Sequence, residues 1–341
     1  ACLHWRDLLM SNELKNPSQD VGQHSSTTGK PVAATRGPHP LLGNRADVAD
    51  KGIIYETAVN ARRPSYLEDH RIYGSVVVPA AAYAEMAVAA GTDACPRQDV
   101  ILQGMAIQQA MFLESGVTRV VQTILTREEK DLLRFRICSR ADRDREDEST
   151  WLEHASGKLI AQEEDWAPDQ VDLQPLQETL TERVEAAELY EACHLRGLEY
   201  GPQFQAVRTI RTGGGRSLGE VRIADRLSEQ AADYLLHPAL LDACLQTLAA
   251  ALRLDDISSA LLPVGIDQMR VYIAGESSVW SRGQITSNAK SGKSITADID
   301  ILTADGRFVA SVEGLRIRRV KKEIFTRSRR RDADRSLSRM G

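Results

Sequence analysis

Cysteine is scarce in this sequence and is not spaced for cross-linking or metal binding. Five cysteines occur in 341 residues, and no two of them form a CxxC pair. A disulfide framework or a structural zinc site would need such paired spacings. No set of His, Cys, Asp and Glu residues has the spacing of metal ligands either, so we expect no metal. The pattern favours a reducing, cytoplasmic setting.

Long apolar runs and a strong charge imbalance are also missing. No stretch is long and apolar enough for a membrane span, and the N-terminus lacks the basic and apolar regions of a secretory signal. The formal net charge of −5 argues against a general nucleic-acid binder. Hydrophobic residues make up 42% of the chain, which is enough for a large core. We therefore expect a folded protein that binds neither membranes nor nucleic acid.

Two parts of the chain share one order of elements: a lead-in strand, a Pro-opened apolar helix and several long strands. The first helix begins at Pro79, with Gly91 as its expected C-cap, and the second spans Pro238–Leu252. Proline suits a first helical turn because its missing N–H is unsatisfied there anyway. A further helix is predicted over 182–195. The main predicted strands are 53–59, 100–107, 117–126, 132–139, 151–160, 204–212, 217–223, 279–285, 295–302 and 308–316.

This order predicts an α+β fold with a mainly antiparallel sheet. Residues 1–37 are rich in small polar residues and are interpreted as a linker or N-terminal extension. The dense charges of 140–149 indicate a solvated hairpin loop. The basic segment 323–341 is predicted to be a flexible linker.

The first group with chemical potential is His70, which precedes Gly74 by four residues and Pro79 by nine. Histidine can act as a base near neutral pH, and a glycine lets the backbone approach a ligand closely. The helix opened by Pro79 adds a positive dipole end. These parts suit removal of a proton next to a carbonyl and stabilisation of the resulting oxyanion.

The second group is Asp242, which lies inside the second apolar helix. A carboxylate in such surroundings needs a partner or takes up a proton. Gln246 lies one turn further along on the same face and can hydrogen-bond the carboxyl group. A partly desolvated aspartic acid of this kind suits general-acid catalysis near neutral pH.

A third segment, Tyr200-Gly201-Pro202-Gln203-Phe204, contains a Gly-Pro step that predicts a turn followed by a strand. Tyr200 would present a phenol at this turn, and Phe204 would form an apolar wall.

Together these segments resemble the dehydratase domains of modular polyketide synthases. The patterns His70-x3-Gly74-x4-Pro79, Tyr190-x6-Gly197-x2-Tyr200-Gly201-Pro202-x-Phe204 and Asp242-x3-Gln246 look like the three signatures of that family, in the same order. The segments 39–43 and 262–265 add weaker similarity. Three separate motifs are far more specific than any one alone.

The resemblance implies a double hot-dog fold, with two tandem repeats that each wrap an antiparallel sheet around a long helix. The N-terminal hot dog would cover 38–165, and a connector and the C-terminal hot dog would cover 166–322. A β-hydroxyacyl thioester on the phosphopantetheine arm of an acyl carrier protein would lose water to give the α,β-unsaturated thioester. His70 would remove the α-proton and Asp242 would protonate the leaving hydroxyl, with Gly74 binding the thioester carbonyl.

The same resemblance implies supporting roles for other residues and partners. Gln246 and Tyr200 would orient Asp242 or assist the hydroxyl. Substrate-binding walls would come from Tyr73, Pro79, Pro202, Phe204 and Leu262. No bound cofactor is implied beyond the carrier's phosphopantetheine arm. The expected partners are the acyl carrier protein, neighbouring synthase domains and a second copy in a homodimer.

Two other functions stay open at this level. The same base and acid could also close an oxygen ring by adding a hydroxyl across the new double bond. A non-catalytic hot dog that binds acyl thioesters is the other alternative, against which the intact pair argues. If the domain is catalytic, His70 and Asp242 are expected to face one dry cavity with room for two substrate carbons between them.

Overall fold

A computed structural model of the chain describes residues 39–49, 52–142, 151–163, 167–252, 259–288 and 294–337. The extension predicted for 1–37 and most of the charged loop predicted for 140–149 lie outside these residues.

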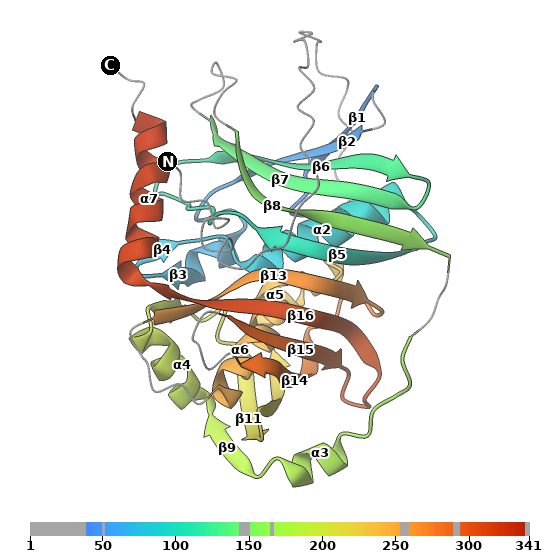
Figure 1. The fold of residues 1–341 in the computed structure, drawn as a ribbon, viewed down its shortest axis with the longest axis vertical. Coiled ribbons are helices and arrows are strands. Elements are labelled where there is room, and N and C mark those ends of the chain that lie inside the picture. The colour runs from blue at the N-terminus through green and yellow to red at the C-terminus, as the bar shows by residue number, and fades with distance from the viewer. Residues whose placement is uncertain are drawn as a thin grey trace.

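One antiparallel sheet of thirteen strands runs through the described part of the molecule (Figure 1). Its order is β1-β2-β6-β7-β8-β5-β13-β16-β15-β14-β12-β11-β9, and β5 pairs with β13 where the front and rear parts of the chain meet. A second sheet holds β10-β3-β4. The strands are β1 (Asn44–Val48), β2 (Gly52–Val59), β3 (His70–Ile72), β4 (Ser75–Val76), β5 (Asp99–Ile107), β6 (Arg119–Glu129), β7 (Leu132–Ala141), β8 (Leu152–Gln162), β9 (Glu182–Glu185), β10 (Leu198–Tyr200), β11 (Val207–Gly213), β12 (Arg216–Arg222), β13 (Ser259–Val271), β14 (Ser278–Asn288), β15 (Ile295–Leu302) and β16 (Phe308–Lys321).

Each half of the large sheet wraps around one long apolar helix. Helix α2 (Ala80–Ala94) packs on β5, β6, β7 and β8, and α6 (Pro238–Ala251) packs on β11, β12, β14 and β15. Both helices are buried on all sides over most of their length, as an apolar sequence without a polar face requires. This arrangement is the predicted α+β double hot dog.

The other helices lie outside the two central ones. They are η1 (Ser65–Asp69), α3 (Gln174–Thr179), α4 (Ala186–Leu195), α5 (Asp225–Ser228), η4 (Ala231–Asp233) and α7 (Lys322–Leu337). Among all helices in the described ranges, none combines the length and apolar character that a bilayer crossing requires.

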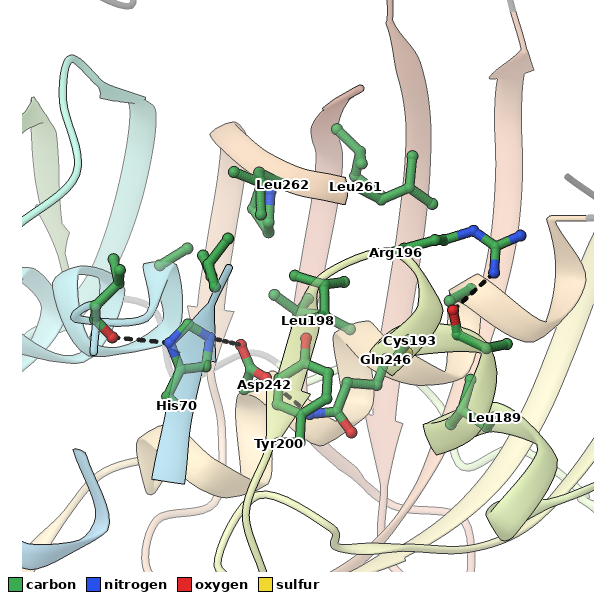
Figure 2. A pocket seen from close by; sticks show the side chains of 18 of the residues that line it. His70, Leu189, Cys193, Arg196, Leu198, Tyr200, Asp242, Gln246, Leu261 and Leu262 are labelled. Atoms are coloured by element: carbon green, nitrogen blue, oxygen red, sulfur yellow. Dashed lines mark hydrogen bonds and ion pairs between the residues drawn. The ribbon is translucent and has the colours of Figure 1, made fainter. Parts of the chain in front are cut away.

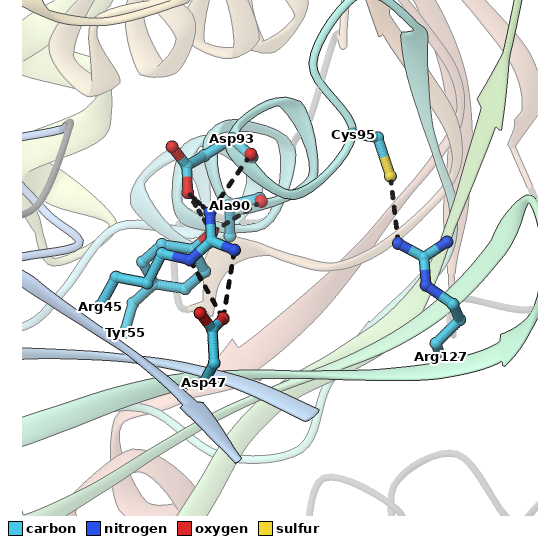
Figure 3. A network of polar contacts seen from close by, with 7 residues as sticks. All are labelled: Arg45, Asp47, Tyr55, Ala90, Asp93, Cys95 and Arg127. Carbon is cyan, nitrogen blue, oxygen red and sulfur yellow. Dashed lines mark hydrogen bonds and ion pairs between the residues drawn. The ribbon is translucent and has the colours of Figure 1, made fainter. Parts of the chain in front are cut away.

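A polar network anchors the C-terminal end of α2 to the edge strands (Figure 3). The Tyr55 hydroxyl donates to Asp93 Oδ2 at 2.6 Å, and Arg45 Nη1 donates to the same oxygen at 2.7 Å. Arg45 also pairs with Asp47, 3.1 Å away. Because Tyr55 is buried and Asp93 is the last acidic residue of α2, the network fixes the helix against β1 and β2.

A buried carboxylate joins the two repeats. Glu85 of α2 is fully buried and accepts the backbone N–H groups of Leu235 and Leu236, at 2.7 and 2.9 Å. His39 Nε2 lies 2.8 Å from the same carboxylate. Leu235 and Leu236 lie just before His237, the N-cap of α6, so Glu85 ties the start of the second central helix to the first.

Three local predictions were wrong. Gly91 does not end α2, which continues to Ala94; a Cβ at Gly91 would lie 2.7 Å from Val100, so glycine is there for helix–strand packing. The first four residues of the helix predicted over 182–195 form β9 instead, because they pair with β11 at the sheet edge. The segment predicted as a flexible linker from 323 begins with helix α7, which a buried Phe325 holds against the domain.

Candidate active site

His70 lies on β3, where pairing with β10 and β4 holds its backbone. The residue is 5% exposed, and its Nδ1 lies 2.8 Å from the carbonyl oxygen of Val77. A carbonyl only accepts, so in the neutral imidazole Nδ1 carries the hydrogen and Nε2 keeps its lone pair. His70 is therefore held in the tautomer of a general base, with Nε2 directed at Asp242 (Figure 2).

Asp242 lies on the second turn of α6 and is also 5% exposed. Its Oδ1 is 3.9 Å from His70 Nε2, and its Oδ2 accepts a hydrogen bond from Gln246 Nε2 at 2.8 Å. Burial raises the pKa of Asp242, against the smaller opposing effects of His70 and Gln246. The carboxyl group thus keeps its proton to a higher pH than an exposed aspartic acid does.

The Gln246 side chain is fixed at both ends. Its Nε2 also donates to the Phe204 carbonyl at 3.2 Å, while its Oε1 accepts from the Tyr190 hydroxyl at 3.2 Å. The Tyr190 oxygen in turn accepts the N–H of Val207 at 3.0 Å. These contacts orient the amide nitrogen toward Asp242, so Tyr190 positions the residue that positions the acid. Tyr190 stands in one of the sequence motifs, but no role was predicted for it.

Two aromatic rings flank the imidazole. Tyr200 on β10 is paired with His70 across the small sheet, with ring centroids 5.7 Å apart. Burial raises the pKa of Tyr200 well above its usual range, so the phenol stays protonated and able to donate. Phe204 is fully buried, and its ring centroid lies 5.1 Å from that of His70.

His70, Asp242, Gln246 and Tyr200 line one cavity of about 300 Å³. Most of its wall is apolar, which strengthens electrostatic interactions inside it. Helix α4, its C-cap Arg196 and the start of β10 supply wall residues that were not predicted from sequence: Leu189, Cys193, Arg196 and Leu198 (Figure 2). Burial raises the pKa of Cys193 to about 12, which keeps it a neutral thiol.

Gly74 is not among the residues that line the cavity. With Tyr73 it forms the two-residue turn between β3 and β4, and both residues have positive φ, +48° for Tyr73 and +76° for Gly74. Gly74 is exposed, and its N–H donates to Glu199 Oε1 at 3.0 Å. Turn geometry therefore accounts for the glycine of this motif, and its predicted contact with the thioester carbonyl stays a prediction.

Of the five predicted wall residues, only Leu262 lines the cavity. Pro202 is exposed on the turn after β10, and Pro79 is the buried N-cap of α2. Phe204 backs the His70 ring. Tyr73 is turned away to bond two backbone groups near the start of β13 and the end of β16. These residues build the frame around the cavity instead of its surface.

Other histidines have structural partners, as predicted for His39, His154 and His237. His154 Nε2 lies 2.7 Å from Ser139 Oγ, and burial lowers the pKa of His154 to about 3. His237 caps α6 by accepting the N–H of Ala239, and burial lowers its pKa to about 4. Both are therefore neutral over the physiological range.

Two hot-dog repeats that share one apolar cavity, with a histidine from one and an aspartic acid from the other, define a double hot-dog enzyme. A family model described as "Polyketide synthase dehydratase domain" matches residues 39–140. A second, described as "Polyketide synthase dehydratase N-terminal domain", matches residues 168–327. The chain belongs to the polyketide synthase dehydratase family.

Similar curated proteins are large synthases. The phthioceranic/hydroxyphthioceranic acid synthase of Mycobacterium tuberculosis is 28% identical over 293 residues, which are 84% of this chain and 13% of that protein. Polyketide synthase GfsE of Streptomyces halstedii is 30% identical over 291 residues, 84% of this chain and 7% of that protein. The chain thus spans a small part of the length of these relatives.

Solved structures of dehydratases have the same fold. The dehydratase domain from the CurF module of curacin polyketide synthase superposes with a TM-score of 0.75 and 29% identity, covering 83% of this chain and 99% of that one. The domain from the CurK module gives a TM-score of 0.75 and 28% identity, covering 84% and 99%. Two inactive mutants of the CurK dehydratase are also similar, one with a histidine replaced by phenylalanine and one with an aspartate replaced by asparagine.

Proposed function

We propose that this chain dehydrates a β-hydroxyacyl thioester, presented on the phosphopantetheine arm of an acyl carrier protein, to the α,β-unsaturated thioester. One observation carries the proposal: His70 Nε2 and Asp242 Oδ1 lie 3.9 Å apart in one apolar cavity. An imidazole whose Nδ1 is bound to a carbonyl and a carboxyl group with a raised pKa suit the roles of base and acid in the elimination of water.

The reaction uses the pair in sequence. His70 Nε2 takes the proton from the α-carbon, and the electrons of that bond move toward the thioester carbonyl. The Cα–Cβ double bond forms as the β-hydroxyl leaves with the proton of Asp242 and becomes water. The pair then holds an imidazolium and a carboxylate, and transfer of the proton back to Asp242 completes the cycle.

The spacing of the pair supports one orientation of the substrate. A gap of 3.9 Å is too narrow for two carbons to sit between the side chains, contrary to the expectation from sequence. We therefore place the Cα–Cβ bond of the substrate in the cavity beside the His70 and Asp242 side chains, and not between them. Both groups then act on one face of the substrate, which favours loss of the hydrogen and the hydroxyl from the same side.

The N-terminal end of α2 replaces Gly74 as the proposed site for the thioester carbonyl. Ala80 is the first residue of α2 and lines the cavity beside His70. The positive end of the helix dipole stabilises negative charge that develops on an oxygen placed there. Tyr200 is assigned to donate to the departing hydroxyl.

Dehydration is favoured over the two alternatives. The solved neighbours named above are dehydratases, which favours water loss over closure of an oxygen ring. The His70–Asp242 pair, built from both repeats and oriented by further side chains, argues against a module that only binds thioesters.

The same proposal includes the setting of the domain. The acyl carrier protein and neighbouring synthase domains are the partners, a homodimer is the assembly and the cytoplasm is the location. We also propose two structural units. The first hot dog covers 38–165, and a connector with the second hot dog covers 166–322.

The test is turnover of a β-hydroxyacyl pantetheine thioester, followed by mass spectrometry as the loss of water. We expect His70→Phe and Asp242→Asn each to lower kcat by about 10²–10⁴-fold, the usual contribution of general acid–base groups. His194→Phe, at an exposed position on α4, is the matched control and should leave the rate unchanged. Full turnover by folded His70→Phe protein would contradict the proposal.

A further inference from the structure

Helix α7 supplies one residue to the active-site cavity. Its first residues, from Lys322 to Ile324, are exposed, whereas Phe325 is only 1% exposed. Phe325 lines the same cavity as His70 and Asp242. The helix follows β16 and stands beside the small sheet that carries His70 (Figure 1). A wall residue therefore comes from a segment that follows the last strand of the second repeat.

The Phe325 ring is packed between two other aromatic rings. Its centroid lies 5.5 Å from that of Tyr73 and 5.2 Å from that of Phe112, both in edge-to-face geometry. Phe112 is bridged through its backbone to Val77, whose carbonyl holds the His70 imidazole. Phe325 thus contacts a residue that pairs with Val77, which in turn positions His70.

Tyr73 is itself immobilised, which fixes one side of this aromatic contact. Its hydroxyl donates to the Val320 carbonyl at 2.9 Å and accepts the N–H of Ala260 at 3.0 Å. Its backbone N–H donates to the Gly197 carbonyl at 2.7 Å. The Phe325 ring therefore packs against a tyrosine that three hydrogen bonds hold in place.

We propose that Phe325 is a specificity-determining residue, which limits the size of the acyl group that the cavity accepts. The inference rests on the proposed dehydratase function. In a cavity of about 300 Å³, the size of one aromatic wall residue changes the room left for an acyl group. A pocket discriminates between substrates by roughly 10–200-fold for each methylene group that fits or fails to fit.

The experiment compares two β-hydroxyacyl pantetheine thioesters, a short linear one and a longer branched one. The full chain is used, with the variants Phe325→Leu, Phe325→Ala and Phe325→Trp. We expect Phe325→Ala to raise the kcat/KM ratio of the branched to the linear substrate about tenfold, and Phe325→Leu to raise it less. Phe325→Trp should lower the ratio. Ile324→Ala, 38% exposed on the same helix, should leave it unchanged.

Two results would overturn the inference or separate it from the proposed function. If folded Phe325→Leu and Phe325→Trp proteins, checked by thermal unfolding, keep the wild-type ratio, Phe325 does not set substrate size. If the wild type dehydrates neither thioester, the proposed function fails instead. Calorimetric binding of the same two thioesters then decides on Phe325, because an equal Kd ratio in wild type and variants would refute the size limit.

Discussion

The chemistry of the two central residues is set by their immediate neighbours. The Val77 carbonyl selects the tautomer of His70, and Gln246 selects which oxygen of Asp242 faces the imidazole. Neither effect needs an additional charge near the site. Desolvation is the largest influence on Asp242, so its proton is held mainly by the apolar wall.

The buried acid should make the protein less stable at neutral pH than an uncharged substitute does. Because the folded-state pKa of Asp242 is raised, the folded protein holds its proton more strongly than the unfolded chain. Stability from this group is complete below the unfolded pKa of about 3.9 and is lost as pH rises through the folded pKa. We expect Asp242→Asn to raise the free energy of unfolding by about 1–2 kcal/mol at pH 7.

Urea unfolding between pH 4 and pH 8 measures this effect. The difference between Asp242→Asn and wild type should shrink toward pH 4, where the aspartic acid is protonated in the folded protein and about half protonated in the unfolded chain. A constant difference over the whole range would show that the variant acts through packing and not through titration.

At the scale of elements, the β3–β4 turn depends on two glycines for different reasons. Gly197 has a φ of +81°, and a Cβ there would lie 2.2 Å from the Tyr73 ring. Gly74 also has positive φ, but a Cβ there would meet no atom within 4 Å. Gly197 is thus required by both conformation and space, and Gly74 by conformation alone.

This pair makes a matched prediction. We expect Gly197→Ala to lower the free energy of unfolding by about 3 kcal/mol or more, because the ring of Tyr73 must move. Gly74→Ala should lower it by about 1 kcal/mol, the strain of a left-handed backbone. Thermal unfolding compares the two. Equal losses would mean that Tyr73 yields at little cost and is not a fixed part of the frame.

Elements were predictable from sequence where local signals agreed with packing. Pro79 and Pro238 mark the starts of the two central helices, and the strands follow from apolar alternation. Segment 182–185 was not predictable, because its pairing with β11 is decided by residues far along the chain. Helix α7 was missed because its sequence is strongly basic and, among its residues 322–329, whose burial is described, Phe325 alone is buried.

The residues of the site also fall into two groups, those that the sequence predicted and those that it did not. His70, Asp242, Gln246 and Tyr200 could be found because each stands in a motif with fixed spacing, and the structure brings them into one cavity. The remaining wall could not be found. It includes apolar side chains from α2, α4, α6, β13, β16 and α7, which meet only after the two repeats have packed together. No local pattern distinguishes such residues from an ordinary core.

At the scale of the whole molecule, Glu85 is the polar link between the repeats. Its carboxylate is fully buried and bonds two backbone N–H groups and His39. Glu85→Gln removes the negative charge and replaces one carboxylate oxygen by an NH2 group. That NH2 group would then face a backbone N–H group, which is also a donor. We expect a loss of about 3 kcal/mol or more in the free energy of unfolding.

Urea denaturation tests this link, with Glu191→Gln at an exposed position on α4 as the control. The control should change stability by less than about 0.5 kcal/mol. If both substitutions have equally small effects, α6 is placed by apolar packing alone and the carboxylate is dispensable.

The ladder between β5 and β13 has a further consequence. Its backbone hydrogen bonds, such as those around Met105 and Ile266, make the two repeats parts of a single continuous sheet. Cutting the chain into its halves would leave each with a bare strand edge, ready to recruit whatever strand it meets. Neither half is thus an exchangeable cassette, and an engineer who wants a chimaeric enzyme must transplant both hot dogs together.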